Sequence, residues 1–434
     1  MQKKLIAAAV AGAFVAPGMA MAQNPSTVQI FGTIYMEYSW ATVGAQGAGN
    51  QSGTVPNGGL AGGFPTGDRT SVDSLQSPGS EIGFKGEEKL GGSLSAWFQC
   101  ISTADYRGQA GNGWCQRNSA VGFKGAWGNV FVGNWDTPFK RTVDLGRVGG
   151  ADTGIYGTAF LFAGTSATVN GRATPTGWKR RQNNSFTYES PRWGGFQVLG
   201  MASVLSTADV IASLVTSAVP GSKPRLYSLA ASYVNGPLAI GAGYEQHENF
   251  WTGANAAGGA AAFTTFGGSD KAWHLSAAYT FFGKLKVGGS YLWSDHDTSN
   301  VNLAGFVAGS SNSNFKQQTA MVGADWAISG PWGVRGNWTW AGDSKGSMGG
   351  NVIGGLVTPT LIGNRVANGG AGGTGANLYQ VQVYHKFSKR TEVAVGYVYL
   401  DQEGSARYSL GGQVNGPAAG VTQQAVGLSA RHTF

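Results

Sequence analysis

Charged side chains and long apolar runs are both scarce in this sequence of 434 residues. Only 12% of its residues are Asp, Glu, Lys or Arg. After residue 22, no window approaches the run of about 18 apolar residues that a membrane-spanning helix needs, so the sequence excludes a helical membrane protein. The chain contains instead 72 Gly, 14 Trp, 15 Tyr and 21 Phe. These aromatic residues are spread through segments of alternating polarity, which argues against disorder.

Cysteine is nearly absent, and histidine is never clustered. The only two cysteines, Cys100 and Cys115, bracket a glycine-rich stretch without a neighbouring His, which favours a disulfide over a zinc site. The five histidines are scattered and lack the spacing of metal ligands. No Ser-His-acid set and no phosphate-binding glycine motif can be placed in the sequence. We therefore expect no enzymatic activity, no metal and no cofactor.

The N-terminus has the pattern of a secretory signal peptide. Lys3 and Lys4 precede an apolar run from Leu5 to Val15, and Ala20-Met21-Ala22 supplies small residues at the cleavage site. We predict cleavage after Ala22, which leaves residues 23–434 as a single domain. Removal of two lysines leaves 28 basic against 22 acidic residues, a net charge of +6. Because the basic residues are dispersed and the chain is exported, we expect no binding of nucleic acid.

The last segment of the chain alternates strictly between two kinds of side chain. One face is largely apolar and the other is small or polar: Val426, Leu428, Ala430, His432 and Phe434 against Gly427, Ser429, Arg431 and Thr433. A strand can place the first set against lipid and the second against water. The pattern recurs along the whole chain, and only a closed sheet satisfies the backbone of such strands in lipid. The sequence therefore predicts an all-β fold, a transmembrane antiparallel β-barrel of 16 strands.

Short and long connections alternate between these predicted strands. The short ones include Ala126 to Asn129, Asn235 to Pro237 and Ser388 to Arg390, whereas Thr42 to Pro78 and Gly342 to Ala376 are long and rich in Gly, Ser and Asn. Short periplasmic turns and long extracellular loops are typical of outer-membrane barrels. The alternation gives an even number of strands with both termini in the periplasm. A soluble β-sandwich has the same side-chain alternation, but it explains neither the signal peptide nor the loop asymmetry.

The chain resembles the Gram-negative general porin family over nearly its whole mature length. Five segments carry the resemblance in order: GFKGEEKLGG at Gly83 to Gly92, VGFKGAWGNVFVGN at Val121 to Asn134, NNSFTYESPRWGGF at Asn183 to Phe196, FSKRTEVAVGYVY at Phe387 to Tyr399, and the terminal Phe434. The resemblance implies a homotrimer in the outer membrane, in contact with lipid and lipopolysaccharide. It also implies a third loop folded into the lumen and passive diffusion of small hydrophilic solutes and ions.

The third long connection, about residues 137–180, is the candidate for that constriction loop. Its charged residues are mostly basic: Lys140, Arg141, Arg147, Arg172, Lys179 and Arg180 against Asp144 and Asp152. Strand parity adds charged side chains on the inner wall: Glu37, Lys85, Arg181, Lys286 and Arg335. Lys85 and Arg181 match the family's basic ladder, whereas Glu81 stands where the family usually has Arg. Because a narrow basic pore concentrates anions, we predict modest anion selectivity.

Two other functions remain open for such a barrel. A substrate-specific channel would need a track of binding groups, and parity places Phe31, Tyr35 and Trp97 inside. A surface adhesin or receptor would instead use the long loops and would conduct little or no current. Single-channel conductance separates these classes.

Overall fold

The structure, a computed structural model, describes most of the chain outside its N-terminus and parts of the long connections. The described residues are 28–44, 70–108, 113–151, 153–163, 168–169, 172–173, 177–204, 224–255, 262–297, 314–347, 373–404, 406, 408–410 and 420–434. The predicted signal peptide, residues 1–22, lies outside these ranges.

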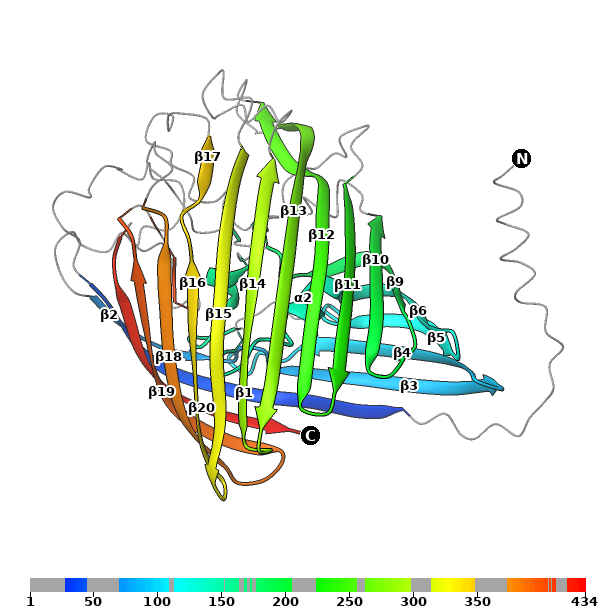
Figure 1. The fold of residues 1–434 in the computed structure, drawn as a ribbon, viewed down its shortest axis with the longest axis horizontal. Helices are drawn as coiled ribbons and strands as arrows, with labels where there is room; N and C mark the ends of the chain where they lie inside the picture. Colours follow the sequence, from blue (N-terminus) through cyan, green and yellow to red (C-terminus); the bar gives the residue numbers. More distant parts are fainter. Residues whose placement is uncertain are drawn as a thin grey trace.

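One antiparallel sheet makes up nearly all of the described chain (Figure 1). Its strands are β1 (Gln29–Val43), β2 (Thr70–Gln76), β3 (Glu81–Gly91), β4 (Leu94–Thr103), β5 (Ser119–Gly125), β6 (Gly128–Asp136), β9 (Arg181–Glu189), β10 (Phe196–Val204), β11 (Arg225–Asn235), β12 (Leu238–Asn255), β13 (Ala262–Phe281), β14 (Leu285–Asp297), β15 (Asn314–Ser329), β16 (Trp332–Ala341), β17 (Lys345–Ser347), β18 (Ala376–Lys386), β19 (Thr391–Gln402) and β20 (Gln423–Thr433). A small separate hairpin joins β7 (Thr168–Val169) to β8 (Arg172–Ala173).

The sheet closes into the predicted barrel of 16 strands. Its 18 segments reduce to 16 because β2 and β3 both pair with β1, and β16 and β17 both pair with β15. The first and last strands close the ring, with Thr33 opposite Thr433 and Val43 opposite Gln423. Phe434 extends the seam, since its backbone N–H donates to the carbonyl of Gly32 at 3.1 Å. Among the described strands of the barrel, closure leaves no open sheet edge, as a lipid environment requires.

Burial follows the predicted alternation along the strands. In β1 the side chain of Trp40 is 51% exposed whereas Ser39 is fully buried, and in β20 Leu428 is 57% exposed whereas Ser429 is buried. The stripe on β13 behaves in the same way, because Leu275 is exposed and Ser276 is buried. Apolar side chains therefore cover the outside of the barrel, and small or polar ones line the inside.

Short turns join neighbouring strands at one end of the barrel, and the chain's C-terminus lies at that end (Figure 1). The predicted turns at Asn235 to Pro237, Phe282-Gly283 and Ser388 to Arg390 all join strand pairs. No helix in the described ranges is long and apolar enough to span a membrane.

The second barrel strand is longer than the sequence predicted. Residues 42–78 were expected to be a connection, but β1 continues to Val43 and β2 pairs with it from Thr70 onwards. Residues 77–80 interrupt this strand, and the hydroxyl of Ser80 bonds to both the backbone N–H and the carbonyl of Tyr35, each at 2.8 Å. The sequence of β2 shows no regular alternation, because its apolar residues Val72 and Leu75 fall on opposite faces, so only its pairing with β1 reveals it as a strand.

The predicted disulfide joins Cys100 to Cys115. Cys100 belongs to β4, and the segment that returns to β5 is held there by a hydrogen bond from the backbone N–H of Arg117 to the carbonyl of Ile101, 2.9 Å. The cross-link closes a loop across a sequence separation of 15 residues.

Removing this cross-link is expected to destabilise the barrel. The paired replacement Cys100→Ser with Cys115→Ser should lower the free energy of unfolding by about 3 kcal/mol, because the unfolded chain regains the entropy of the open loop. Urea unfolding of the folded protein, with and without reductant, measures the effect. The Ser pair should be insensitive to reductant, and equal midpoints for both proteins would contradict the prediction.

Candidate functional site, a basic cavity inside the barrel

The connection from β6 to β9, residues 137–180 and called L3 below, lies against the inner wall at residues 138–149 and 155–163. It begins with the helix α2 (Pro138–Val143), capped by Thr137, whose side chain accepts the backbone N–H of Lys140. Three inward serines of the wall then bond to the helix backbone: Ser228 accepts from Phe139 N at 3.0 Å, Ser276 donates to Thr142 O at 2.7 Å, and Ser290 donates to Val143 O at 2.9 Å. Small polar wall residues thus satisfy backbone groups of a buried loop.

Glycines then allow the backbone of L3 to touch the backbone of the wall. A β-carbon at Gly146 would lie 2.0 Å from the carbonyl oxygen of Gly289, and one at Gly149 would lie 2.0 Å from that of Gly336. On the wall, a β-carbon at Gly323 would lie 1.9 Å from the carbonyl oxygen of Val148. Such distances exclude any side chain, so these contacts need glycine on both surfaces.

The far part of L3 is attached to β1 and β20. The carboxylate of Glu37 accepts the backbone N–H of Ile155 at 2.8 Å and the hydroxyl of Tyr35 at 2.9 Å. Tyr156 donates to the carbonyl of Gly427 at 2.8 Å. Burial, and secondarily the Glu37 carboxylate, raise the pKa of Tyr156, so its phenol keeps the proton that it donates. The helix α3 (Ala159–Phe162) follows, and its buried side chains pack on the wall.

A second connection also reaches this part of the wall. The buried Tyr408, between β19 and β20, receives hydrogen bonds at its carbonyl from Gln423 (2.6 Å) and at its phenol oxygen from Gln317 (3.1 Å). Its backbone N–H donates to Gln402 at 2.7 Å. Tyr408 shares one hydrophobic cluster with Tyr156 of L3. Two connections therefore fill part of the barrel interior.

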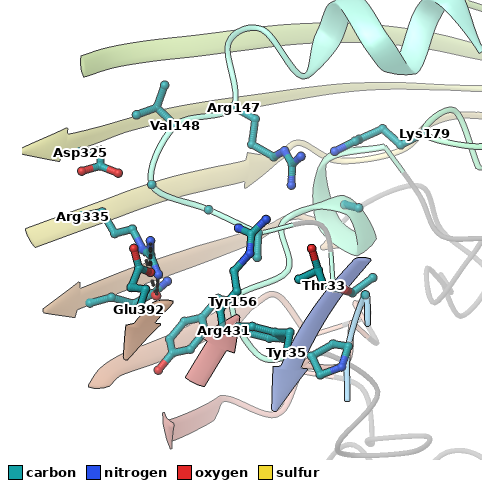
Figure 2. A pocket seen from close by; sticks show the side chains of 18 of the residues that line it. Thr33, Tyr35, Arg147, Val148, Tyr156, Lys179, Asp325, Arg335, Glu392 and Arg431 are labelled. Carbon is teal, nitrogen blue, oxygen red and sulfur yellow. Dashed lines mark hydrogen bonds and ion pairs between the residues drawn. The ribbon is translucent and has the colours of Figure 1, made fainter. Parts of the chain in front are cut away.

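Beside L3 lies a cavity with a volume of about 710 Å³. Eight basic residues line it: Arg117, Lys140, Arg147, Lys179, Arg181, Lys286, Arg335 and Arg431. Three acidic residues line it: Glu81, Asp325 and Glu392. Figure 2 shows Arg147 and Lys179 of L3 with Arg335 and Arg431 of the wall around this space. The lining thus carries a formal charge of 8 − 3 = +5.

Most of these cations are held by a carboxylate. Asp144 pairs with Lys179 at 2.5 Å and with Arg147 at 3.2 Å, while Arg335 pairs with Glu392 at 2.8 Å. Asp136 pairs with Lys140 at 2.9 Å and with Arg181 at 3.3 Å, and Arg117 pairs with Glu81 at 2.7 Å. Within the described chain, Lys286 and Arg431 form no ion pair. Because carboxylates are fewer than cations, the cavity keeps a positive field.

The structure brings about half of the predicted pore residues to this cavity. Glu81, Arg147, Arg181, Lys286 and Arg335 line it. Asp144 and Glu37 lie behind the lining as an ion-pair partner and as a hydrogen-bond acceptor, respectively.

Three predicted residues lie elsewhere, and one cannot be placed. The Nζ of Lys85 is 5.0 Å from the centre of the Phe31 ring and is not part of the lining. Arg141 forms an ion pair with Glu189. Arg180 is close enough to Glu245 for their charges to interact. Asp152 lies outside the described residues.

Sequence reasoning missed several lining residues. Arg431 in β20 and Glu392 in β19 have inward parity, but parity does not distinguish them from other inward residues, and Arg117 precedes β5, where parity does not apply. The three inward aromatics do not make a track, because Tyr35 lines the cavity, Phe31 lies under Lys85, and Trp97 packs edge-on against Phe131 at 5.3 Å. In the described part of the chain, no group of three or more His, Cys, Asp or Glu could hold a metal ion.

Known outer-membrane proteins resemble this chain in sequence over limited stretches. The major outer membrane protein P.IB of Neisseria gonorrhoeae is 33% identical over 118 residues, which are 27% of this chain and 30% of the relative. The P.IB protein of Neisseria meningitidis serogroup B is 35% identical over 145 residues, 33% of this chain and 37% of the relative. The matches thus span between about a third and two fifths of these relatives.

Two solved structures share the fold over nearly the whole chain. The anion-selective porin from Comamonas acidovorans superposes with a TM-score of 0.62 at 20% identity, covering 94% of this chain and all of that one. The outer-membrane expressed OmpT of Vibrio cholerae gives a TM-score of 0.59 at 15% identity, covering 95% and 99%. The sequence model of the Gram-negative porin family matches residues 7–405. With its closed 16-strand barrel and a match over most of its length, this chain belongs to the Gram-negative porin family and is an outer-membrane protein.

Proposed function

We propose that the protein forms a water-filled channel for passive diffusion of small hydrophilic solutes and ions, with a modest preference for anions. The observation that carries the proposal is the cavity beside L3, lined by eight basic and three acidic residues. In a narrow pore with walls of low dielectric constant, such an excess of charge raises the local concentration of anions. L3 then acts as the constriction loop over residues 137–180. The Comamonas acidovorans porin, which shares the fold, is described as anion-selective.

The ion preference can be measured directly. Purified protein in a planar bilayer under a KCl gradient should give a reversal potential that indicates faster passage of Cl⁻ than of K⁺. Raising the salt concentration should weaken the preference, because mobile ions screen the lining charges. A clear cation preference at low salt would refute the proposed selectivity, and an absence of conductance would refute the channel itself.

We further propose that the channel assembles as a homotrimer. The outer faces of the first and last strands, with Trp40 and Leu428 exposed, offer apolar surface to a neighbouring copy or to lipid and lipopolysaccharide. OmpT of Vibrio cholerae, which shares the fold, has been solved in a trimer form. Electrophoresis in SDS without heating should show a band of trimer mass that becomes a monomer after heating.

A further inference from the structure

One tryptophan of L3 is enclosed by aromatic rings from the wall and from L3 itself. The indole of Trp178 is 2% exposed. It stacks on His247 of β12, with ring centres 4.5 Å apart and planes at 22°, and its ring centre lies 5.4 Å from that of His296 of β14. Phe139 of α2 lies 6.1 Å away between ring centres. The backbone N–H of Trp178 also donates to the carbonyl of Ala163 at 3.0 Å. This hydrogen bond joins the two residues that flank residues 164–177 of L3.

Each of the two histidine rings lies beside a buried carboxylate. The Nε2 of His247 lies 2.9 Å from a carboxylate oxygen of Glu245, and the Nδ1 of His296 lies 3.4 Å from one of Asp270. All four of these side chains are buried. The contact between His247 and Glu245 is a hydrogen bond, and a buried pair of this kind needs a defined geometry, since each group would lose its hydrogen bond if it moved. The hydrogen bond therefore holds the ring of His247 in place against Trp178, and the ring of His296 lies near the same indole.

The residues that follow the tryptophan carry charges of the cavity. Lys179 lines the cavity although its side chain is only 1% exposed, and its Nζ lies 2.5 Å from Asp144. Arg181 also lines the cavity and begins β9. Lys179 directly follows Trp178 and Arg181 is three residues away, so a displacement of the backbone at Trp178 would displace both cations.

We propose that His247 and His296 clamp Trp178 and that these three are positioning residues, which set Lys179 and Arg181 at the cavity and thereby tune its ion preference. The proposal rests on the proposed channel function. The ring pairs supply stacking in addition to burial, and the carboxylate of Glu245 holds His247 where stacking is possible. The competing explanation is that Trp178 only fills space behind L3.

Truncation of the tryptophan separates these explanations. In Trp178→Ala we expect the unit conductance to rise and the anion-to-cation permeability ratio to fall about twofold, because the two cations lose their fixed positions. Trp178→Phe retains a ring between the histidines and should restore most of the wild-type ratio. The matched control is Trp273→Ala, which removes an exposed tryptophan on the outside of β13 and should change neither quantity.

A double-mutant comparison tests the clamp itself. If the histidines act through Trp178, then Trp178→Ala should have little further effect on conductance and permeability ratio in a His247→Gln, His296→Gln background. An undiminished effect in that background, or a wild-type ratio in Trp178→Ala, would overturn the proposal. If Trp178→Ala does not assemble, the histidine double variant alone must show the changed ratio. A cation preference of the wild type would refute the proposed selectivity, yet the coupling of Trp178 to the histidines would still be measurable in the conductance.

Discussion

Charge reversal at Lys286 and Arg431 is expected to abolish most of the anion preference. Both residues line the cavity and neither forms an ion pair within the described chain, so their replacement by Glu disrupts no partner. Each reversal changes the lining charge by two, from +5 to 5 − 4 = +1. Adding Arg147→Glu gives 1 − 2 = −1, and the preference should then change to cations. Reversal potentials in a KCl gradient, measured for the double and the triple variant, provide the test.

Lys85→Glu is the matched control for these reversals. It makes the same change of charge on a wall strand, but Lys85 lies over Phe31 outside the cavity lining. We expect its reversal potential to stay close to that of the wild type. If Lys85→Glu shifts the potential as strongly as the cavity variants do, the selectivity is set by the total charge of the lumen and the cavity has no special role.

Gly323→Ala is expected to displace L3 from the wall. The new β-carbon would lie 1.9 Å from the carbonyl oxygen of Val148 and 2.8 Å from that of Gly336, and neither backbone group can rotate away as a side chain could. Overpacking of this kind costs about 1–3 kcal/mol. We therefore expect a lower free energy of unfolding together with a larger and noisier single-channel conductance, because L3 moves away from β15 and β16.

Gly200→Ala shows whether loss of a strand glycine is enough to cause these changes. Gly200 lies in β10 with no atom within 4 Å of the β-carbon position, so the substitution meets open space. Its conductance should equal that of the wild type, and its stability should change little. An unchanged conductance in Gly323→Ala would show that L3 does not narrow the pore at this contact.

The barrel can be predicted from the sequence because the side-chain pattern that indicates it is local. A strand between lipid and water repeats every two residues, so Trp40 and Ser39, or Leu428 and Ser429, already show which side chain faces which solvent. Turn residues at Asn235 to Pro237 and at Phe282-Gly283 mark the strand ends in the same local way. Parity likewise identified Lys286, Arg335 and Arg181 as inward residues, and all three line the cavity.

Only the tertiary structure decided which inward charges share one space. Parity treats Lys85 and Lys286 alike, but their height along the barrel depends on strand register and tilt, and only Lys286 reaches the cavity. The carboxylate that holds Arg335, and the histidines that enclose Trp178, come from strands distant in the sequence. The sequence by itself determined the closed sheet and the sign of its excess charge. The seating of L3 required the assembled wall, because backbone contacts such as that of Gly323 with Val148 join segments that no local pattern connects.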